Sequence, residues 1–197
     1  ILSRLAATRD QVQRDLEAFR FNDAARALYE FVWNEYCDWY LELTKPRVYG
    51  EDPRAAATAL ITAAGVLHAL LRLLHPFMPF LTEEIWHWTY AKDPDMNETI
   101  HRSPWPTLDE FASVADPTSP GTYEIVCTVV EAVRKAKAEK NLSMKAPITK
   151  VTIAASLDTL DALNPAIDDV KGMLHVEAIK MITGEGLNTD AQVTVEV

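Results

Sequence analysis

Apolar residues recur at helical spacing through the first half of the chain, and this period constrains the fold more than any other feature. The opening segment repeats them three, four or seven positions apart, at Leu2, Leu5, Val12, Leu16 and Phe19. Such a stripe forms one face of an amphipathic helix, which is stable only when that face is buried against another element. The sequence therefore predicts a bundle of about four or five helices.

The second helical segment carries residues that predict where it begins and ends. Asn22 suits its N-cap, and Asp23 would lie in the first turn, where a negative charge is favourable. The helix is expected to end near Thr44, because Pro46 disfavours helical geometry in the residue before it.

A third helix is expected from about Arg54 to Leu74, and a short fourth one over the sequence EEIWHWTY. The third is apolar almost all round and is expected to lie inside the bundle. Charged and imidazole side chains and two prolines interrupt its apolar stretch, so it is interpreted as a helix of a soluble protein rather than a membrane span. The fourth helix could begin with Thr82 as its cap or with Pro79 in its first turn.

The second half of the chain changes character. Residues from about 92 to 122 are rich in proline and predict an irregular connection. A helix then precedes the alternating strand ITKVTIAA, a helix interrupted before Pro165, and two strands joined by the turn-rich TGEGLNTD. The predicted fold is mainly α: a helix bundle over residues 1–121, followed by a small α+β lobe over residues 122–197.

Charge and cysteine content limit the possible functions. The formal net charge is -10, which argues against general binding to a polyanion, so any nucleic-acid contact must rest on a local patch. Cys37 and Cys127 form no motif, and a cytoplasmic origin fits best. Because the chain opens at Ile1 on an amphipathic pattern, it is expected to be part of a longer polypeptide, and the lack of a targeting signal carries no weight.

Aromatic residues are densest between Phe19 and Arg47. Core packing is the ordinary role of such rings. Rings near a helix end can instead stack on the unpaired bases of an RNA loop. Phe21, next to Arg20 and Asn22, is therefore the first candidate for base stacking, with Asn22 or Arg20 reading a base edge.

Basic residues supply candidates for phosphate contact. The first group lies in the first two helices and comprises Arg4, Lys45 and Arg47. The second is a stripe at every third position in the later helix, at Arg134, Lys137 and Lys140. Most of these side chains are expected to lie on solvated helix faces, and Arg134 and Lys137 are the candidates for contact with an RNA backbone.

The segment RFNDAARALYEFVWNEYCDWYLELTKPR closely resembles the anticodon-binding domain of valyl-tRNA synthetases. Three further segments are also similar to that family: LLRLLHPFMPFLTEEIWHW, TIHRSPWP and VVEAVRKAKAEKN. Leucine and isoleucine enzymes have a similar sequence in the first of these. The resemblance is strong through about Trp105 and weaker beyond it. WNEYCDWYLELTK favours the valine enzyme over its relatives.

The resemblance implies a helical bundle that docks the anticodon arm of valine tRNA, without a catalytic site or cofactor of its own. ATP with magnesium would bind the catalytic domain of the same polypeptide, because the His-x-Gly-His and Lys-Met-Ser-Lys-Ser type motifs of that domain are missing from this sequence. The alternatives are the same module of an isoleucine or leucine enzyme, or a bundle that docks only on protein. Neither involves a membrane.

A metal-binding bundle is the third alternative. His68, Arg72 and His75 share one helix face, and Glu84 and His87 have the Glu-x-x-His spacing of di-iron bundles. The two histidines are two turns apart with an arginine between them. A polar stripe on a mostly buried helix is the preferred interpretation, and no metal ligand is assigned.

Overall fold

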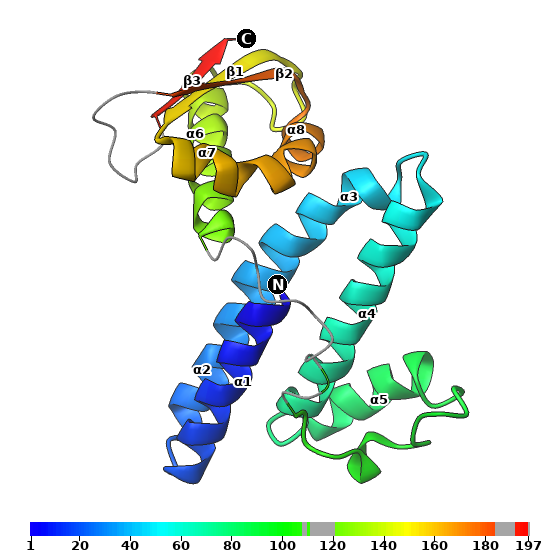
Figure 1. Ribbon diagram of the computed structural model, residues 1–197. Helices are drawn as coiled ribbons and strands as arrows, with labels where there is room; N and C mark the ends of the chain where they lie inside the picture. The colour runs from blue at the N-terminus through cyan, green and yellow to red at the C-terminus, as the bar shows by residue number, and fades with distance from the viewer. Residues whose placement is uncertain (108–109, 111–120, 184–191, 197) are drawn as a thin grey trace. The chain divides into compact units, whose positions relative to one another are not determined.

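The computed structural model describes residues 1–107, 110, 121–183 and 192–196 (Figure 1). Its residues fall into two compact units. The helical unit comprises the described residues of Ile1–Leu41 and Arg54–Asp116, and the α+β unit those of Glu42–Pro53 and Pro117–Val197. The sequence-based division at residue 121 did not place Glu42–Pro53 with the second unit.

The helical unit consists of helices α1 (Leu2–Glu17), α2 (Phe21–Glu30), η1 (Phe31–Leu41), α4 (Pro53–Leu74), α5 (Pro79–Thr89) and the short η2 (Ile100–Arg102). The apolar stripes meet in one core, whose fully buried members include Leu5, Val12, Leu28, Phe31, Val66 and Leu73. Burying one such side chain contributes roughly 1.5–3 kcal/mol. The expected bundle is thus confirmed.

Helix η1 follows α2 without a break and is a π-helix. Both α2 and η1 carry aromatic rings, some of which are buried in the core while others are exposed to solvent. Phe31 and Tyr36 are buried, and the Tyr36 hydroxyl donates to the carbonyl of Ala63 at 2.9 Å. Tyr29 and Trp33 are exposed and stack with ring centroids 6.4 Å apart. Core packing therefore accounts for some of the rings but not for all of them.

Helix α4 has the predicted extent, but the prediction that it lies wholly inside the bundle is wrong. Its second half is buried from Ala69 to Leu73, whereas Leu60 and Ile61 in its first half are exposed. By length and composition alone α4 could cross a membrane, a property that core helices of soluble bundles share. The interpretation as a soluble helix stays a prediction.

Helix α5 packs against α4 through a second small cluster of Leu71, Trp86 and Ile100. The Trp86 indole N–H donates to the carbonyl of Asn97 at 2.8 Å. Pro79 occupies the first turn of α5 and Met78 its N-cap, without a side-chain capping bond. Of the two predicted starts, the one based on Pro79 is confirmed.

Helix α3 (Glu42–Val48) corrects the prediction that the second helix ends near Thr44. Helical geometry continues through Pro46 to Val48, although Pro46 has no N–H to donate. Packing within the α+β unit compensates, because the Pro46 ring lies directly against Gly172. A Cβ atom added at Gly172 would come 2.6 Å from two atoms of that ring.

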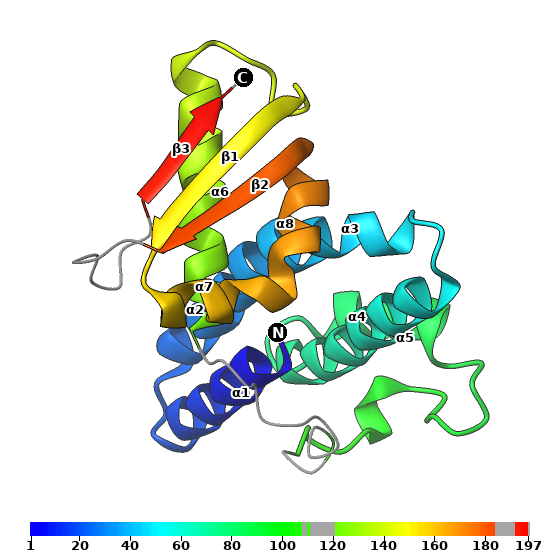
Figure 2. The same cartoon turned by 45° about the horizontal axis from the view of Figure 1, so that its top comes forward.

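The α+β unit contains α6 (Thr122–Glu139), β1 (Ile148–Ala155), α7 (Leu157–Leu163), η4 (Asn164–Ala166), α8 (Ile167–Leu174), β2 (Val176–Thr183) and β3 (Gln192–Glu196). The sheet order is β2-β1-β3, with β2 parallel and β3 antiparallel to β1. Figure 1 and Figure 2 both show α6, α7 and α8 on one face of this sheet. The predicted helix, the strands and the interruption before Pro165 are confirmed, while most of TGEGLNTD lies outside the described residues.

Candidate nucleic-acid interface

The corner between α1 and α2 is built by a left-handed residue that is not glycine. Phe19 has φ 57°, its N–H donates to the carbonyl of Leu16 at 3.0 Å, and the N–H of Arg20 donates to the carbonyl of Asp15 at 2.7 Å. These two bonds form the Schellman motif that ends many helices, with its left-handed position usually occupied by glycine. A side chain with a Cβ is strained there by about 1–2 kcal/mol.

The ring of Phe19 does not compensate by packing into the core. It is 79% exposed and meets the ring of Phe21, itself 54% exposed, edge-to-face at a centroid distance of 6.1 Å. A strained, exposed aromatic residue indicates a functional role more strongly than a structural one. Sequence analysis missed Phe19 because its spacing fits the apolar stripe of α1.

Asn22 lies beside this ring pair, but not as a cap. Helix α2 begins two residues earlier than predicted, so that Arg20 is the N-cap and Asn22 lies in the first turn. The Asn22 side chain is exposed, while Asp23 occupies the first turn as expected. The amide of Asn22 is therefore accessible to a ligand that contacts the rings.

Arg20 is exposed, but its guanidinium is held by neighbouring carboxylates. Its Nε and Nη2 atoms donate to Asp15 Oδ1 at 3.0 and 2.5 Å, and Asp23 lies 3.7 Å from Nε. Hydrogen bonds from Gln11 and Arg20 lower the pKa of Asp15 and keep it charged. Arg20 thus positions the corner, and the prediction that it reads a base edge has no support in this geometry.

The corner is locally neutral in a chain that is strongly acidic. Between residues 14 and 26 there are three arginines and three acids, namely Arg14, Arg20, Arg26, Asp15, Glu17 and Asp23. Arg26 pairs with Asp23 at 2.8 Å, which further offsets the carboxylates beside the rings. A neutral surface with exposed rings does not repel a polyanion as the average surface does.

Arg4 and Lys45, the first two predicted phosphate contacts, are held in ion pairs. Arg4 donates through Nε and Nη2 to both carboxylate oxygens of Glu35, at 2.7 and 2.8 Å. Lys45 pairs with Glu42 at 2.5 Å. Each cation must leave or share its partner to bind phosphate.

Arg47 and Arg134 belong to the α+β unit. Arg47 forms a two-pronged pair with the carboxylate of Asp169 on α8. Arg134 is half-buried on α6, at the same cavity as Lys45. The structure thus does not gather the predicted phosphate contacts at one surface.

Lys137 corrects the prediction of a solvated basic stripe. Its side chain is fully buried, and its Nζ donates to the carbonyls of Met144 and Leu174 at 2.7 and 2.9 Å. It cannot contact an RNA backbone from the surface, because the neighbouring α8 and the loop after α6 cover it. Lys140, three residues on, is exposed as expected.

The polar stripe of α4 is a network within the helical unit. His68 lies against the rings of Trp86 and Tyr90, with centroids 5.1 and 4.9 Å away. Arg72 pairs with Glu110 at 2.5 Å. Among the described residues, no group of three or more His, Cys, Asp or Glu side chains could hold a metal ion.

Solvent-facing rings at a neutral helix corner can stack on unpaired bases, which defines this bundle as a candidate RNA-loop-binding module. Sequence comparison is more specific. A family model described as the anticodon-binding domain of tRNA ligase matches residues 1–153. The chain belongs to this family.

Similar curated proteins are named valine--tRNA ligase. The chain is 37% identical to that of Agrobacterium fabrum over 180 residues, which are 91% of this chain and 19% of the relative. It is 36% identical to that of Rhizobium meliloti over the same shares of both, and 43% identical to that of Carboxydothermus hydrogenoformans over 72% of this chain and 15% of the relative. The chain spans about a fifth of the length of the first two relatives.

Proposed function

We propose that this chain recognises the anticodon arm of valine tRNA as part of a valine–tRNA ligase. Family membership and the names of the similar proteins support this assignment over an isoleucine or leucine enzyme. The observation that carries the mechanism is the exposed pair Phe19 and Phe21 at a neutral helix corner.

In this mechanism the chain binds and positions RNA and performs no chemistry. An anticodon base stacks on Phe21 or Phe19, and the Asn22 amide, with one acceptor and two donors, reads the edge of a base. A mismatched base leaves such a group without a partner, and this loss supplies discrimination. Attachment of valine, which uses ATP and magnesium, belongs to the catalytic domain of the same polypeptide in the cytoplasm.

The test is a titration of the chain with transcribed valine tRNA and with the same tRNA carrying an altered anticodon. The valine anticodon is expected to bind more tightly. Phe21→Ala and Phe19→Ala are each expected to weaken binding by about 1–3 kcal/mol, the usual worth of one stacked base.

Phe80→Ala is the matched control, because Phe80 on α5 is also an exposed phenylalanine, with 91% of its surface accessible. It is expected to bind like the unchanged chain. Equal binding of both anticodons, or equal losses from all three substitutions, would contradict the proposal and favour a bundle that docks on protein.

A further inference from the structure

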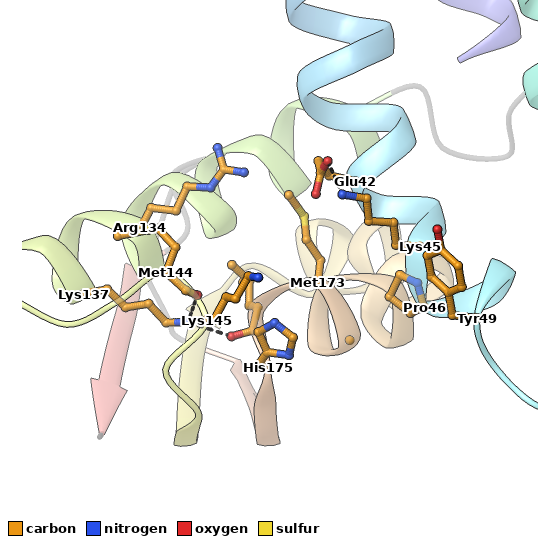
Figure 3. A pocket seen from close by; sticks show the side chains of 12 residues that line it. Glu42, Lys45, Pro46, Tyr49, Arg134, Lys137, Met144, Lys145, Met173 and His175 are labelled. Carbon is orange, nitrogen blue, oxygen red and sulfur yellow. Dashed lines mark hydrogen bonds and ion pairs between the residues drawn. The ribbon is translucent and has the colours of Figure 1, made fainter.

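The α+β unit contains a cavity of about 750 Å³. Residues of α3, of α6 and the loop after it, and of the end of α8 line the cavity, and Figure 3 shows their side chains around it. This volume lies within the range of small-molecule sites. None of the contacts described above for the α1–α2 corner involves these residues.

The lining of the cavity has a charge opposite to that of the whole chain. Four of its residues are cationic, namely Lys45, Arg134, Lys137 and Lys145. Among the described residues that line it, Glu42 is the one acid, and its carboxylate is already paired with Lys45 at 2.5 Å. In a chain of net charge -10, this local excess of positive charge is a feature that an anionic ligand would explain.

Lys137, which is buried in the wall of the cavity, adds to this excess of positive charge. It is fully buried, and no carboxylate of the described residues lies within ion-pair distance of it. Burial accordingly lowers its pKa. Two carbonyls accept hydrogen bonds from its ammonium group but do not cancel its charge. An uncompensated buried cation is costly. An anion in the adjoining cavity would provide the missing charge.

The remaining lining is apolar and partly aromatic. Met144 and Met173 approach the cavity from the loop after α6 and from α8, and Pro46 and Tyr49 line the side formed by α3 and the residue after it. Methionine adapts its shape to flat rings, and tyrosine stacks on them. The cavity thus joins a cationic part to an apolar part.

We propose that this cavity binds a nucleotide unit, whose phosphate faces Arg134 and Lys145 and whose base lies against Met144, Met173 and Tyr49. Lys137 contributes through its charge and not by contact, because its side chain is fully buried. The nucleotide is either a free mononucleotide or one residue of a bound RNA chain, since the two share this chemistry. The site goes beyond anticodon recognition and does not depend on it.

The first experiment measures binding of adenosine monophosphate and of inorganic phosphate to the whole chain by calorimetry. Adenosine monophosphate is expected to bind more tightly, because phosphate alone does not use the apolar wall. Lys145→Gln and Arg134→Gln are each expected to weaken this binding about tenfold, the loss of one charge-assisted hydrogen bond. Lys140→Gln, an exposed lysine on the same segment outside the cavity, is the control and is expected to have no effect.

The second experiment separates the two sources of the nucleotide. If it belongs to RNA, Lys145→Gln weakens binding of valine tRNA and of an anticodon-altered tRNA by the same factor, and lowers the slope of log K against log salt by about 1. If the nucleotide is free, Lys145→Gln weakens only adenosine monophosphate.

The inference is overturned if Lys145→Gln and Arg134→Gln leave every probe unaffected, or if adenosine monophosphate binds no better than phosphate. Failure of anticodon discrimination would contradict the proposed function alone, because the mononucleotide experiment does not use tRNA. Lys137→Met, compared by circular dichroism with the unchanged chain, provides a further variant. If folded, it is expected to bind adenosine monophosphate more weakly, and unchanged binding would contradict the role of its charge.

Discussion

At the scale of single residues, Phe19 lowers the stability of the fold, because it has a strained backbone and an exposed ring. Its left-handed backbone is one that glycine adopts without strain, and its ring gains little burial in return. Such a residue is expected where a protein has been selected for binding rather than for maximal stability.

The substitution Phe19→Gly is therefore expected to raise the free energy of unfolding by about 1 kcal/mol, since it removes the Cβ strain. The same change is expected to weaken binding of valine tRNA. Urea unfolding and tRNA titration of one preparation measure both effects. A loss of stability with unchanged tRNA binding would make Phe19 a structural residue.

Residue-level patterns predicted only part of the candidate site. Exposure of Phe21 and Asn22 agrees with the prediction that they contact a ligand, although their contact with RNA stays a prediction. The pairing of Arg4 with Glu35 and of Arg47 with Asp169 could not be predicted, because the partners are distant in sequence. The periodicity of α6 likewise could not show that α8 and a loop cover Lys137.

At the scale of elements, helical periods and strand alternation predicted nearly every helix and strand of the described residues. The errors lie where packing between elements outweighs local preference. Proline ends many helices, yet the ring of Pro46 packs on Gly172 and the helix continues. Helix α4 is apolar almost all round, but Leu60 and Ile61 in its first half are exposed.

The network at the end of α4 gives the helical unit a dependence on pH. His75 contacts Thr82 through Nδ1 at 2.7 Å and His101 through Nε2 at 2.9 Å. Burial, and then the neighbouring His101, lower the pKa of His75, and burial, and then Arg72, lower that of His68. The folded state therefore binds fewer protons than the unfolded state between these lowered pKa values and the ordinary value near 6.5.

Stability from these two histidines is thus expected to be fully present above about pH 6.5 and to be lost as the pH falls through their folded pKa values. His75→Gln is expected to lessen this loss, as measured by urea unfolding at pH 7 and at mildly acidic pH. His87→Gln, an exposed histidine of α5, serves as the control. An identical pH dependence in all three chains would exclude His75 as a contributor.

At the scale of the whole molecule, a net charge of -10 has to be reconciled with an RNA partner. The α1–α2 corner is locally neutral. Ion pairs within the chain hold Arg4, Arg20, Lys45 and Arg47. These paired cations are less available to displace counterions from a phosphate backbone. Recognition would then rest on rings and amides more than on charge.

Binding of valine tRNA is accordingly expected to depend weakly on salt. With about three phosphate contacts, the slope of log K against log salt would be near -2. Titrations at several salt concentrations measure this slope. A slope several times steeper would indicate an extensive cationic surface and contradict the assignment to the neutral corner.

The α+β unit is discontinuous along the chain, because Glu42–Pro53 belongs to it while the residues on both sides belong to the helical unit. Arg47 with Asp169, and Pro46 with Gly172, join this inserted stretch to the C-terminal portion. No single cut in the gene can therefore separate the two units intact. The coding segments for both parts of the α+β unit have to be inherited together. Recombination that exchanged only one half of the coding sequence would separate Glu42–Pro53 from the C-terminal portion that it packs against.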